Sequence, residues 1–178
     1  KLDKNNKIQL DLFKLPFEEI EKKIPSPLYI NVDGYSTLHP SISPDGKRLY
    51  FASDRPGGFG GMDLYFVPLE KGVVTGEVTN LGPDINTSED EVFPFLYEND
   101  ILFYSSRTTE KRLSIMLAIN RIWNRWESKL LQKPFNSDGD NFSFSIVKKY
   151  KIGFLTSNRI GGKGDDDIYA FDFITNLK

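Results

Sequence analysis

The chain has 178 residues and a formal net charge of −2, with 39% apolar and 27% charged residues. These values are ordinary for one globular domain, and the dispersed lysines and arginines argue against nucleic-acid binding. The absence of cysteine excludes disulfides, thiolate metal sites and cysteine nucleophiles. The longest apolar runs have four or five residues, so we expect no membrane-spanning segment. Because the sequence opens on Lys1 rather than methionine, we expect a processed protein or an excised fragment.

Short runs rich in Tyr, Phe, Ile, Leu and Val alternate with Gly, Pro, Asn and Asp clusters, which predicts closely spaced strands in an all-β fold. Residues 1–29 contain one predicted strand, Ile8–Leu15, and one predicted helical turn, Pro16–Ile24. The following residues predict four strands, in order His39–Ser43, Arg48–Ser53, Asp63–Val67 and an edge strand near Glu77–Asn80. The turn Pro44-Asp45-Gly46 suits a tight connection between the first two of these four.

The same order of strands recurs twice further along the chain. The second set is predicted at Val92–Leu96, Ile101–Ser106, Leu113–Ile119 and Trp123–Leu131. The third set is predicted at Phe142–Val147, Ile152–Ser157 and Asp167–Phe173, and its fourth strand is left undefined. Each set follows a linker of a hydrophobe, an asparagine and a small residue: Ile30-Asn31-Val32, Ile85-Asn86-Thr87 and Phe135-Asn136-Ser137.

Three arginines mark the period of the repeat, because Arg55, Arg107 and Arg159 stand 52 residues apart (107 − 55 = 52 and 159 − 107 = 52). A serine precedes each by two positions: Ser53, Ser105 and Ser157. Recurrence in every unit favours a structural role, in which hydroxyl and guanidinium hydrogen-bond within or between units. The alternative is a ring of cations that holds an anionic ligand.

Units of about 50 residues with four antiparallel strands are typical of β-propeller blades. We predict about three blades, at residues 30–84, 85–134 and 135–178, with residues 1–29 as the tail of a preceding blade or a linker. Propellers close with about four to eight blades, so we expect part of a larger, six-bladed ring that other residues continue. An alternative is that two copies assemble into one ring.

The glycine-rich connections of the first and third units align without gaps, Arg55–Tyr65 with Arg159–Tyr169. A phosphate-binding loop is one interpretation, but in such loops a helix follows and its N-terminal amides hold the phosphate. Here a strand follows, which favours a tight connection between strands. Asp63 and the aligned Asp167 begin these strands, and we interpret both as structural.

Asp165 and Asp166, next to Asp167, are candidate calcium ligands, because calcium prefers carboxylate and carbonyl oxygens. The EF-hand spacing is missing, and consecutive residues on a strand point to opposite faces, so the three acids cannot all converge. We therefore favour a structural interpretation of the acidic run and predict no cofactor.

Catalytic residues are not predicted in this chain. His39 is the only histidine and no Gly-x-Ser-x-Gly phrase occurs, so neither a histidine metal cluster nor a nucleophile elbow is expected. For His39 we favour burial or a hydrogen bond over catalysis. Trp123 and Trp126 fall on a predicted edge strand, where packing against the next unit is favoured over contact with a partner protein.

Five phrases carry a resemblance to a known family: His39–Gly46, Leu49–Tyr65, Leu81–Thr87, Glu91–Phe95 and Thr156–Tyr169. They resemble the Pro-Asp-Gly type of β-propeller repeat (Tol-like or WD-like), related to the propeller of the periplasmic Tol translocation protein. They are most similar to the repeats of OmpA-family cell-envelope proteins of Bacteroidota. The second unit departs from this pattern, with Thr108–Lys111 in place of the diglycines and Tyr97–Asp100 in place of Pro-Asp-Gly.

The resemblance implies a non-enzymatic scaffold for protein interactions in the periplasm, associated with the outer membrane. Its implied partners are other envelope proteins, including those of gliding motility or type IX secretion machinery. Peptidoglycan contact is implied only through a C-terminal OmpA-like domain that these residues do not include. An alternative is the propeller of a glycan-active or peptidase enzyme whose catalytic residues lie outside this segment. A kelch-type module is a further alternative, but the tyrosine–tryptophan pair expected after the diglycines is missing.

Overall fold

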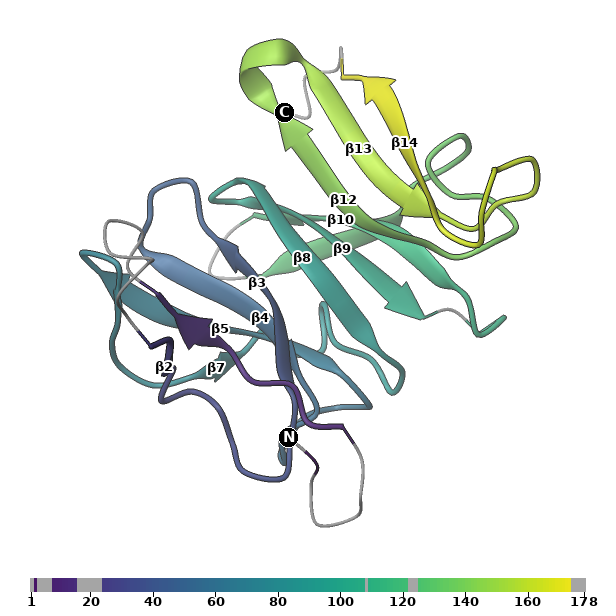
Figure 1. Cartoon of the computed structure of the whole chain (residues 1–178). Coiled ribbons are helices and arrows are strands. Elements are labelled where there is room, and N and C mark those ends of the chain that lie inside the picture. Colours follow the sequence, from purple (N-terminus) through teal and green to yellow (C-terminus); the bar gives the residue numbers. More distant parts are fainter. Residues whose placement is uncertain (1, 3–7, 16–23, 108, 122–124, 174–178) are drawn as a thin grey trace.

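The computed structural model describes residues 2, 8–15, 24–107, 109–121 and 125–173, and within them every sheet is antiparallel (Figure 1). No α-helix occurs among these residues, which confirms the all-β prediction. The one helical element in the described part of the chain is a 3-10 turn, η2 (Lys148–Tyr150). The strands form two sheets of four or more strands, one three-stranded sheet and one small N-terminal pair.

The first unit is a sheet in the order β3-β4-β5, with β6 and β7 both paired to β5. Its strands are β3 (Thr37–Ile42), β4 (Arg48–Ser53), β5 (Asp63–Glu70), β6 (Val73–Val74) and β7 (Thr79–Asn80). The predicted edge strand near Glu77–Asn80 corresponds to β7, which pairs Tyr65 with Asn80. The central strand β4 is buried on both faces, because its run Leu49-Tyr50-Phe51-Ala52 is continuously apolar.

The second unit repeats this order as β8-β9-β10-β11. Its strands are β8 (Glu91–Glu98), β9 (Ile101–Arg107), β10 (Leu113–Asn120) and β11 (Trp126–Leu130). The third unit is β12 (Asn141–Val147), β13 (Ile152–Ser157) and β14 (Asp167–Asp172), in the order β12-β13-β14. In β13 only alternate residues are buried, because only one face of this sheet is covered.

Residues 8–15 and 24–29 make a partial unit ahead of the first. Here β1 (Phe13–Lys14) pairs with β2 (Ser26–Pro27), and Ile8 forms an isolated bridge with Leu2. The predicted strand Ile8–Leu15 is thus much shorter in the structure than in the sequence analysis. The helical turn predicted at Pro16–Ile24 lies outside the described residues apart from Ile24.

The hydrophobic cores lie between successive sheets rather than within one. Tyr50 and Leu64 of the first unit pack against Leu102 and Tyr104 of the second. The second core joins β9 and β10 to β12 and β13 of the third unit, and the third core joins the first unit to residues 12 and 28. Each fully buried Leu or Phe stabilises the fold by about 1.5–3 kcal/mol, so burial between units holds the sheets side by side.

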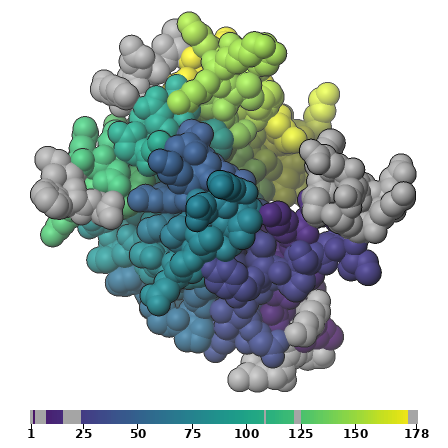
Figure 2. All heavy atoms as spheres, turned by 90° about the vertical axis from the view of Figure 1, so that its left-hand side faces the viewer, coloured from purple at the N-terminus to yellow at the C-terminus, as the bar shows by residue number. Residues whose placement is uncertain are grey.

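The first strands of the three units lie together, since β8 contacts both β3 and β12. In Figure 1 the sheets follow one another from β3–β5, through β8–β10, to β12–β14 near the C-terminus. The space-filling view in Figure 2 shows the same succession, with purple and blue in the lower part and light green at the top. At each boundary between complete units, the second and third strands of one unit therefore pack against the first two strands of the next.

Candidate functional site

An asparagine from each linker fastens one unit to the unit before it. The Asn86 Oδ1 accepts the Leu64 N–H at 2.8 Å, and its Nδ2 donates to the Leu64 carbonyl at 3.0 Å. Asn136 holds Ile115 in the same way, at 2.7 and 2.9 Å. Asn31 holds Leu12, at 2.9 and 2.8 Å. We call this two-bond contact the asparagine clamp.

A second contact accompanies each clamp, two residues earlier in the sequence than the clamped residue. The Leu10 N–H donates to the Ser36 hydroxyl at 3.2 Å, the Met62 N–H to Asp90 at 3.0 Å and the Leu113 N–H to Asp140 at 2.7 Å. Clamp and second contact together align the units residue by residue. Leu12, Leu64 and Ile115 are equivalent, as are Leu10, Met62 and Leu113. The partial unit at residues 8–15 therefore has the same boundary as the complete ones.

Arg55 and Arg159 occupy the same place in their units and tie the glycine-rich loop to the linker. Arg55 donates to Ser53 Oγ at 3.1 Å, to the Ile30 carbonyl at 2.9 Å and to Thr37 Oγ1 at 3.3 Å. Its guanidinium also lies 5.0 Å from the centre of the Tyr65 ring, a cation–π contact. These bonds lie within one unit and engage the Nε and Nη2 groups of Arg55 with protein oxygens.

Arg159 repeats the pattern with Ser157 Oγ at 3.1 Å and the Phe135 carbonyl at 3.0 Å. Its third partner is Asn141 Oδ1 at 3.0 Å, and its guanidinium lies 4.6 Å from the Tyr169 ring. Thr37 and Asn141 begin the first strands of their units, so each arginine ties its loop to the first strand of its own unit.

Arg107 lies elsewhere, although it continues the 52-residue spacing. It ends β9, and its Nε donates to Asp90 at 2.8 Å in a half-exposed ion pair. The clamp alignment explains the difference: Ile115, the equivalent of Leu64, pairs with Ser105, whereas Leu64 pairs with Ala52. The hairpin of the second unit is thus shifted by one residue against the 52-residue spacing. Arg107 consequently stands at the position of Asp54, not at that of Arg55.

Glu91 takes the place of Thr37 and Asn141 in the second unit and is fully buried. It accepts hydrogen bonds from the Thr87 N–H and hydroxyl, at 2.8 and 2.7 Å, and from the Ser106 hydroxyl at 2.8 Å. Burial raises the pKa of Glu91, and these hydrogen bonds partly oppose that shift. Linker and strand are therefore joined here by a carboxylate instead of an arginine. Ser105, predicted to bond to Arg107, has a buried hydroxyl with no partner.

The glycine-rich loops close around the carboxylates of Asp63 and Asp167. Asp63 accepts the N–H groups of Phe59 and Gly60 at 2.7 and 3.1 Å. Asp167 accepts those of Lys163 and Gly164 at 2.6 and 3.2 Å. These bonds occupy the loop amides internally, which is a structural use of the glycine-rich phrase.

The candidate calcium ligands Asp165 and Asp166 lie in the exposed part of the third-unit loop. Among the described residues, no group of three or more His, Asp or Glu side chains is placed to hold a metal ion. The neighbouring carboxylate of Asp167 accepts hydrogen bonds from the N–H groups of Lys163 and Gly164. It therefore does not join Asp165 and Asp166 as a third metal ligand.

Three β-bulges lie side by side where the first strands meet. The bulges interrupt β3, β8 and β12 after Leu38, Val92 and Phe142. Each contains a residue other than glycine at positive φ: His39 at 52°, Phe93 at 53° and Ser143 at 54°. Such backbone is sparsely populated and costs about 1–3 kcal/mol, so it persists only when its surroundings hold it.

Residues of all three bulges line one groove of about 230 Å³. Within it the His39 ring stacks on Phe93 with a centroid distance of 3.6 Å, and its Nδ1 accepts the Phe93 N–H at 3.4 Å. Burial lowers the pKa of His39 to about 4, which favours the neutral ring. Because Nδ1 accepts the Phe93 N–H, the neutral ring carries its proton on Nε2. The groove therefore combines aromatic surface with small hydroxyl side chains, Ser41, Ser143 and Ser145.

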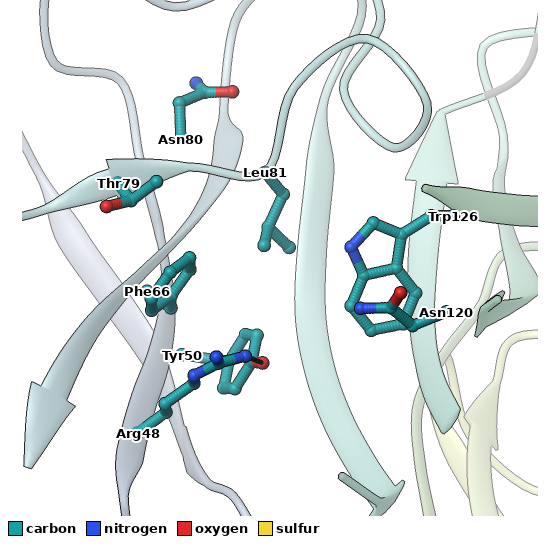
Figure 3. A pocket seen from close by; sticks show the side chains of 8 residues that line it. All are labelled: Arg48, Tyr50, Phe66, Thr79, Asn80, Leu81, Asn120 and Trp126. Carbon is teal, nitrogen blue, oxygen red and sulfur yellow. Dashed lines mark hydrogen bonds between the residues drawn. The ribbon is translucent and has the colours of Figure 1, made fainter. Parts of the chain in front are cut away.

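A second hollow, of about 240 Å³, lies between the first and second units (Figure 3). Arg48, Phe66, Leu81 and Trp126 line it, with Tyr50 fully buried beside them. The Arg48 guanidinium lies 4.8 Å from the centre of the Phe66 ring and donates to the Tyr50 hydroxyl at 3.5 Å. Among the described residues, no carboxylate forms a salt bridge with Arg48. The hollow thus contains a guanidinium packed against an aromatic ring, a combination that can bind a carboxylate or an aromatic group.

Sequence reasoning missed this hollow because its residues come from β4, β5, β7, β10 and β11. The sequence did single out Trp126, for which packing against the next unit was favoured, but its side chain packs in the core shared with the preceding unit. The linker asparagines of the clamps could be recognised in the sequence, because the linker phrase recurs. The backbone groups that each asparagine binds could not be predicted from that phrase. Trp123 lies outside the described residues.

No protein-family model matches this sequence, and no curated protein matches it either. In the part of the chain that the structure describes, no helix has the length and apolar character needed to cross a membrane.

Proposed function

We propose that the three sheets are successive blades of a β-propeller and that the chain serves as a non-enzymatic scaffold for protein interactions. The observation that carries this proposal is the asparagine clamp, which recurs at three successive boundaries with the same two bonds. Repetition of one boundary between antiparallel sheets, with the first strands together, is what radial stacking of blades requires. A stack held in this way keeps its loops and hollows in fixed relative positions.

The proposed location is the bacterial periplasm, in an outer-membrane-associated protein of the OmpA-like type. This part of the proposal rests on the resemblance of residues 30–173 to the Pro-Asp-Gly repeats of Bacteroidota envelope proteins. The proposed partners are other envelope proteins, including those of gliding or type IX secretion machinery. Peptidoglycan would be reached only through a separate domain, and the proposal includes neither nucleic acid nor a cofactor.

The hollow in Figure 3 is the proposed contact site for a partner protein. Arginine carries much of the binding energy at protein interfaces, and Arg48 lines this hollow beside the buried Tyr50 and Trp126. A guanidinium supported by an aromatic ring receives a carboxylate with two parallel hydrogen bonds. The expected contact is therefore an acidic side chain of the partner, inserted between the first and second units.

The test is site-specific photo-cross-linking in the source bacterium, with the photoreactive residue at Thr79, an exposed residue that lines the hollow. We expect a discrete adduct at Thr79 that is absent when the probe stands at the exposed and distant Lys151. Arg48→Glu should remove the adduct, whereas Lys47→Glu, the same charge change at the preceding residue, should leave it. Adducts that survive Arg48→Glu, or no adduct at Thr79, would contradict this contact site.

A further inference from the structure

The outer face of the third unit differs from the same face of the other two units. Ile168 pairs with Thr156 as Leu64 pairs with Ala52, which makes Ile168 the equivalent of Leu64 and Ile115. Leu64 and Ile115 are each 0% exposed, whereas Ile168 is 76% exposed. Leu64 and Ile115 are covered by the unit that follows, whereas no described residue covers Ile168 in this way.

The loop before this strand shows the same contrast at its glycines. A methyl group built on Gly60 would overlap backbone atoms of residues 87–89, because the linker of the second unit lies against this loop. A methyl group on Gly164, the equivalent glycine of the third unit, would meet nothing within 4 Å. The third unit thus presents an uncovered copy of the boundary that elsewhere receives an asparagine clamp.

We propose that the outer face of β14 docks a further repeat unit, whose linker asparagine clamps the backbone of Ile168. This inference rests on the proposed stacking of blades and names the chemistry of the next one. Its linker carries a hydrophobe, an asparagine and a small residue, as all three linkers of this chain do. Continuity with three boundaries of identical bonding identifies the occupant as a repeat unit rather than an unrelated apolar partner.

Charge narrows the kind of unit that fits. At the second contact of the boundary, Met62 and Leu113 meet an aspartate, Asp90 or Asp140. The third unit has Asp166 at this position, preceded by Asp165. Two acids facing another aspartate would repel it, so we expect the docking unit to present a neutral hydrogen-bond acceptor there, such as a serine hydroxyl. Ser36 of the first unit is such a residue and binds the equivalent N–H of Leu10.

The test is a tandem chain in which residues 1–178 are followed directly by a second copy of residues 20–84. From Ile168 to the added Asn31 this chain runs 22 residues (178 − 168 = 10, then 12 from 20 to 31), as from Leu64 to Asn86 (86 − 64 = 22). The added segment also supplies Ser26–Pro27, which pairs as a fourth strand in the partial unit. A second tandem chain adds residues 20–134, so that the docking unit keeps its own neighbour.

We expect the Ile168 amide to exchange with solvent at least about tenfold more slowly in the tandem chains than in the 178-residue chain. Asn31→Ala in the added copy alone should abolish this protection, while the same change in the original copy should not. Gly164→Ala should lower the denaturant midpoint of the tandem chains and leave that of the natural chain unchanged.

Unchanged exchange at Ile168 in both tandem chains would overturn the docking proposal, whether the added residues fold elsewhere or remain unfolded. Association of the 178-residue chain into dimers that protect Ile168 would also overturn it, because a second copy would then be the occupant. These outcomes are distinct from failure of the cross-linking test, which concerns the Arg48 hollow and leaves the β14 face unaffected.

Discussion

The first and third units bind their loops with an arginine, whereas the second unit uses a buried glutamate. Arg55 and Arg159 join the loop to a linker carbonyl and to the first strand of the unit. Glu91, on the first strand of the second unit, accepts hydrogen bonds from the linker and from Ser106 of the second strand. The asparagine clamp, by contrast, is the same at every boundary. The difference teaches that the backbone clamp defines the repeat, while the side chains that brace each unit can be exchanged.

The largest expected effect is that of Asn86→Ala, which breaks a fully buried clamp. The change removes both bonds to the Leu64 backbone and leaves its N–H without a partner in the core, while its carbonyl still accepts the Leu81 N–H at 3.0 Å. We expect a loss of about 3 kcal/mol in the free energy of unfolding, measured by urea denaturation. Asn31→Ala, at the partly exposed N-terminal clamp, should cost about half as much. Equal losses at Asn31 and Asn86 would contradict the role of burial.

Gly60→Ala and Gly164→Ala compare the same loop position with and without a following unit. An alanine at residue 60 overlaps the backbone of the next linker, so we expect a loss of about 2–3 kcal/mol in the free energy of unfolding. An alanine at residue 164 meets open space, so its effect should stay within about 0.5 kcal/mol. Thermal and urea unfolding of both variants measure this contrast. A comparable loss in the two would remove the distinction between covered and open boundaries.

Arg55→Ala and Arg107→Ala separate the two uses of arginine. Arg55 donates to three protein oxygens and stacks on Tyr65, so its removal should cost about 2 kcal/mol. Arg107 forms a half-exposed ion pair, which is worth about 0–1 kcal/mol. Denaturation in 0.1 M and 1 M salt checks the assignment, because only the Arg107 contribution should weaken strongly with salt. A larger loss of stability for Arg107→Ala than for Arg55→Ala would contradict this assignment. It would indicate that Arg107 is the equivalent of Arg55, as the 52-residue spacing suggests.

The smallest effect is expected from His39, and it depends on pH. Its pKa is about 4 in the folded chain against an ordinary value of 6.5, so the unfolded chain binds more protons between these values. The contribution to stability is therefore fully present above about pH 6.5 and is lost as the pH falls toward 4. We expect a loss on the order of 1 kcal/mol, discounted because the ring is partly exposed.

His39→Asn is the control for this pH dependence, because asparagine tolerates positive φ and does not titrate. The free energies of unfolding of the two proteins, measured from pH 7.5 to pH 4, should converge as the pH falls. Parallel curves would contradict a neutral, buried His39.

Much of the fold could be predicted from the sequence, because apolar runs and turn residues locate strands directly. The strands Arg48–Ser53 and Ile152–Ser157 have the predicted bounds, and five others extend by one to three residues. The predicted strands Ile8–Leu15, Glu77–Asn80 and Asp167–Phe173 are shorter in the structure. The registers could not be predicted, because the bulges at His39, Phe93 and Ser143 leave no signal of residue type. The 52-residue spacing of Arg107 is a case in point: it counts residues, whereas equivalence depends on which strand residues pair.

The candidate sites were less accessible to sequence reasoning. Asp63 and Asp167 were interpreted as structural from their alignment, and the loop amides bound to them give the physical reason. The hollow around Arg48 depends on two units packing together, so no local pattern announces it. For the same reason the exposure of Ile168 could be recognised only against Leu64 and Ile115 in the folded chain.

Hydrogen exchange at Leu64, Ile115 and Ile168 tests the central claim most directly, since these three residues hold one position in successive units. The asparagine clamps should slow the exchange of the Leu64 and Ile115 amides by at least about a hundredfold relative to Ile168 in the 178-residue chain. Equal exchange rates at all three amides would contradict a repeated boundary closed by asparagine clamps.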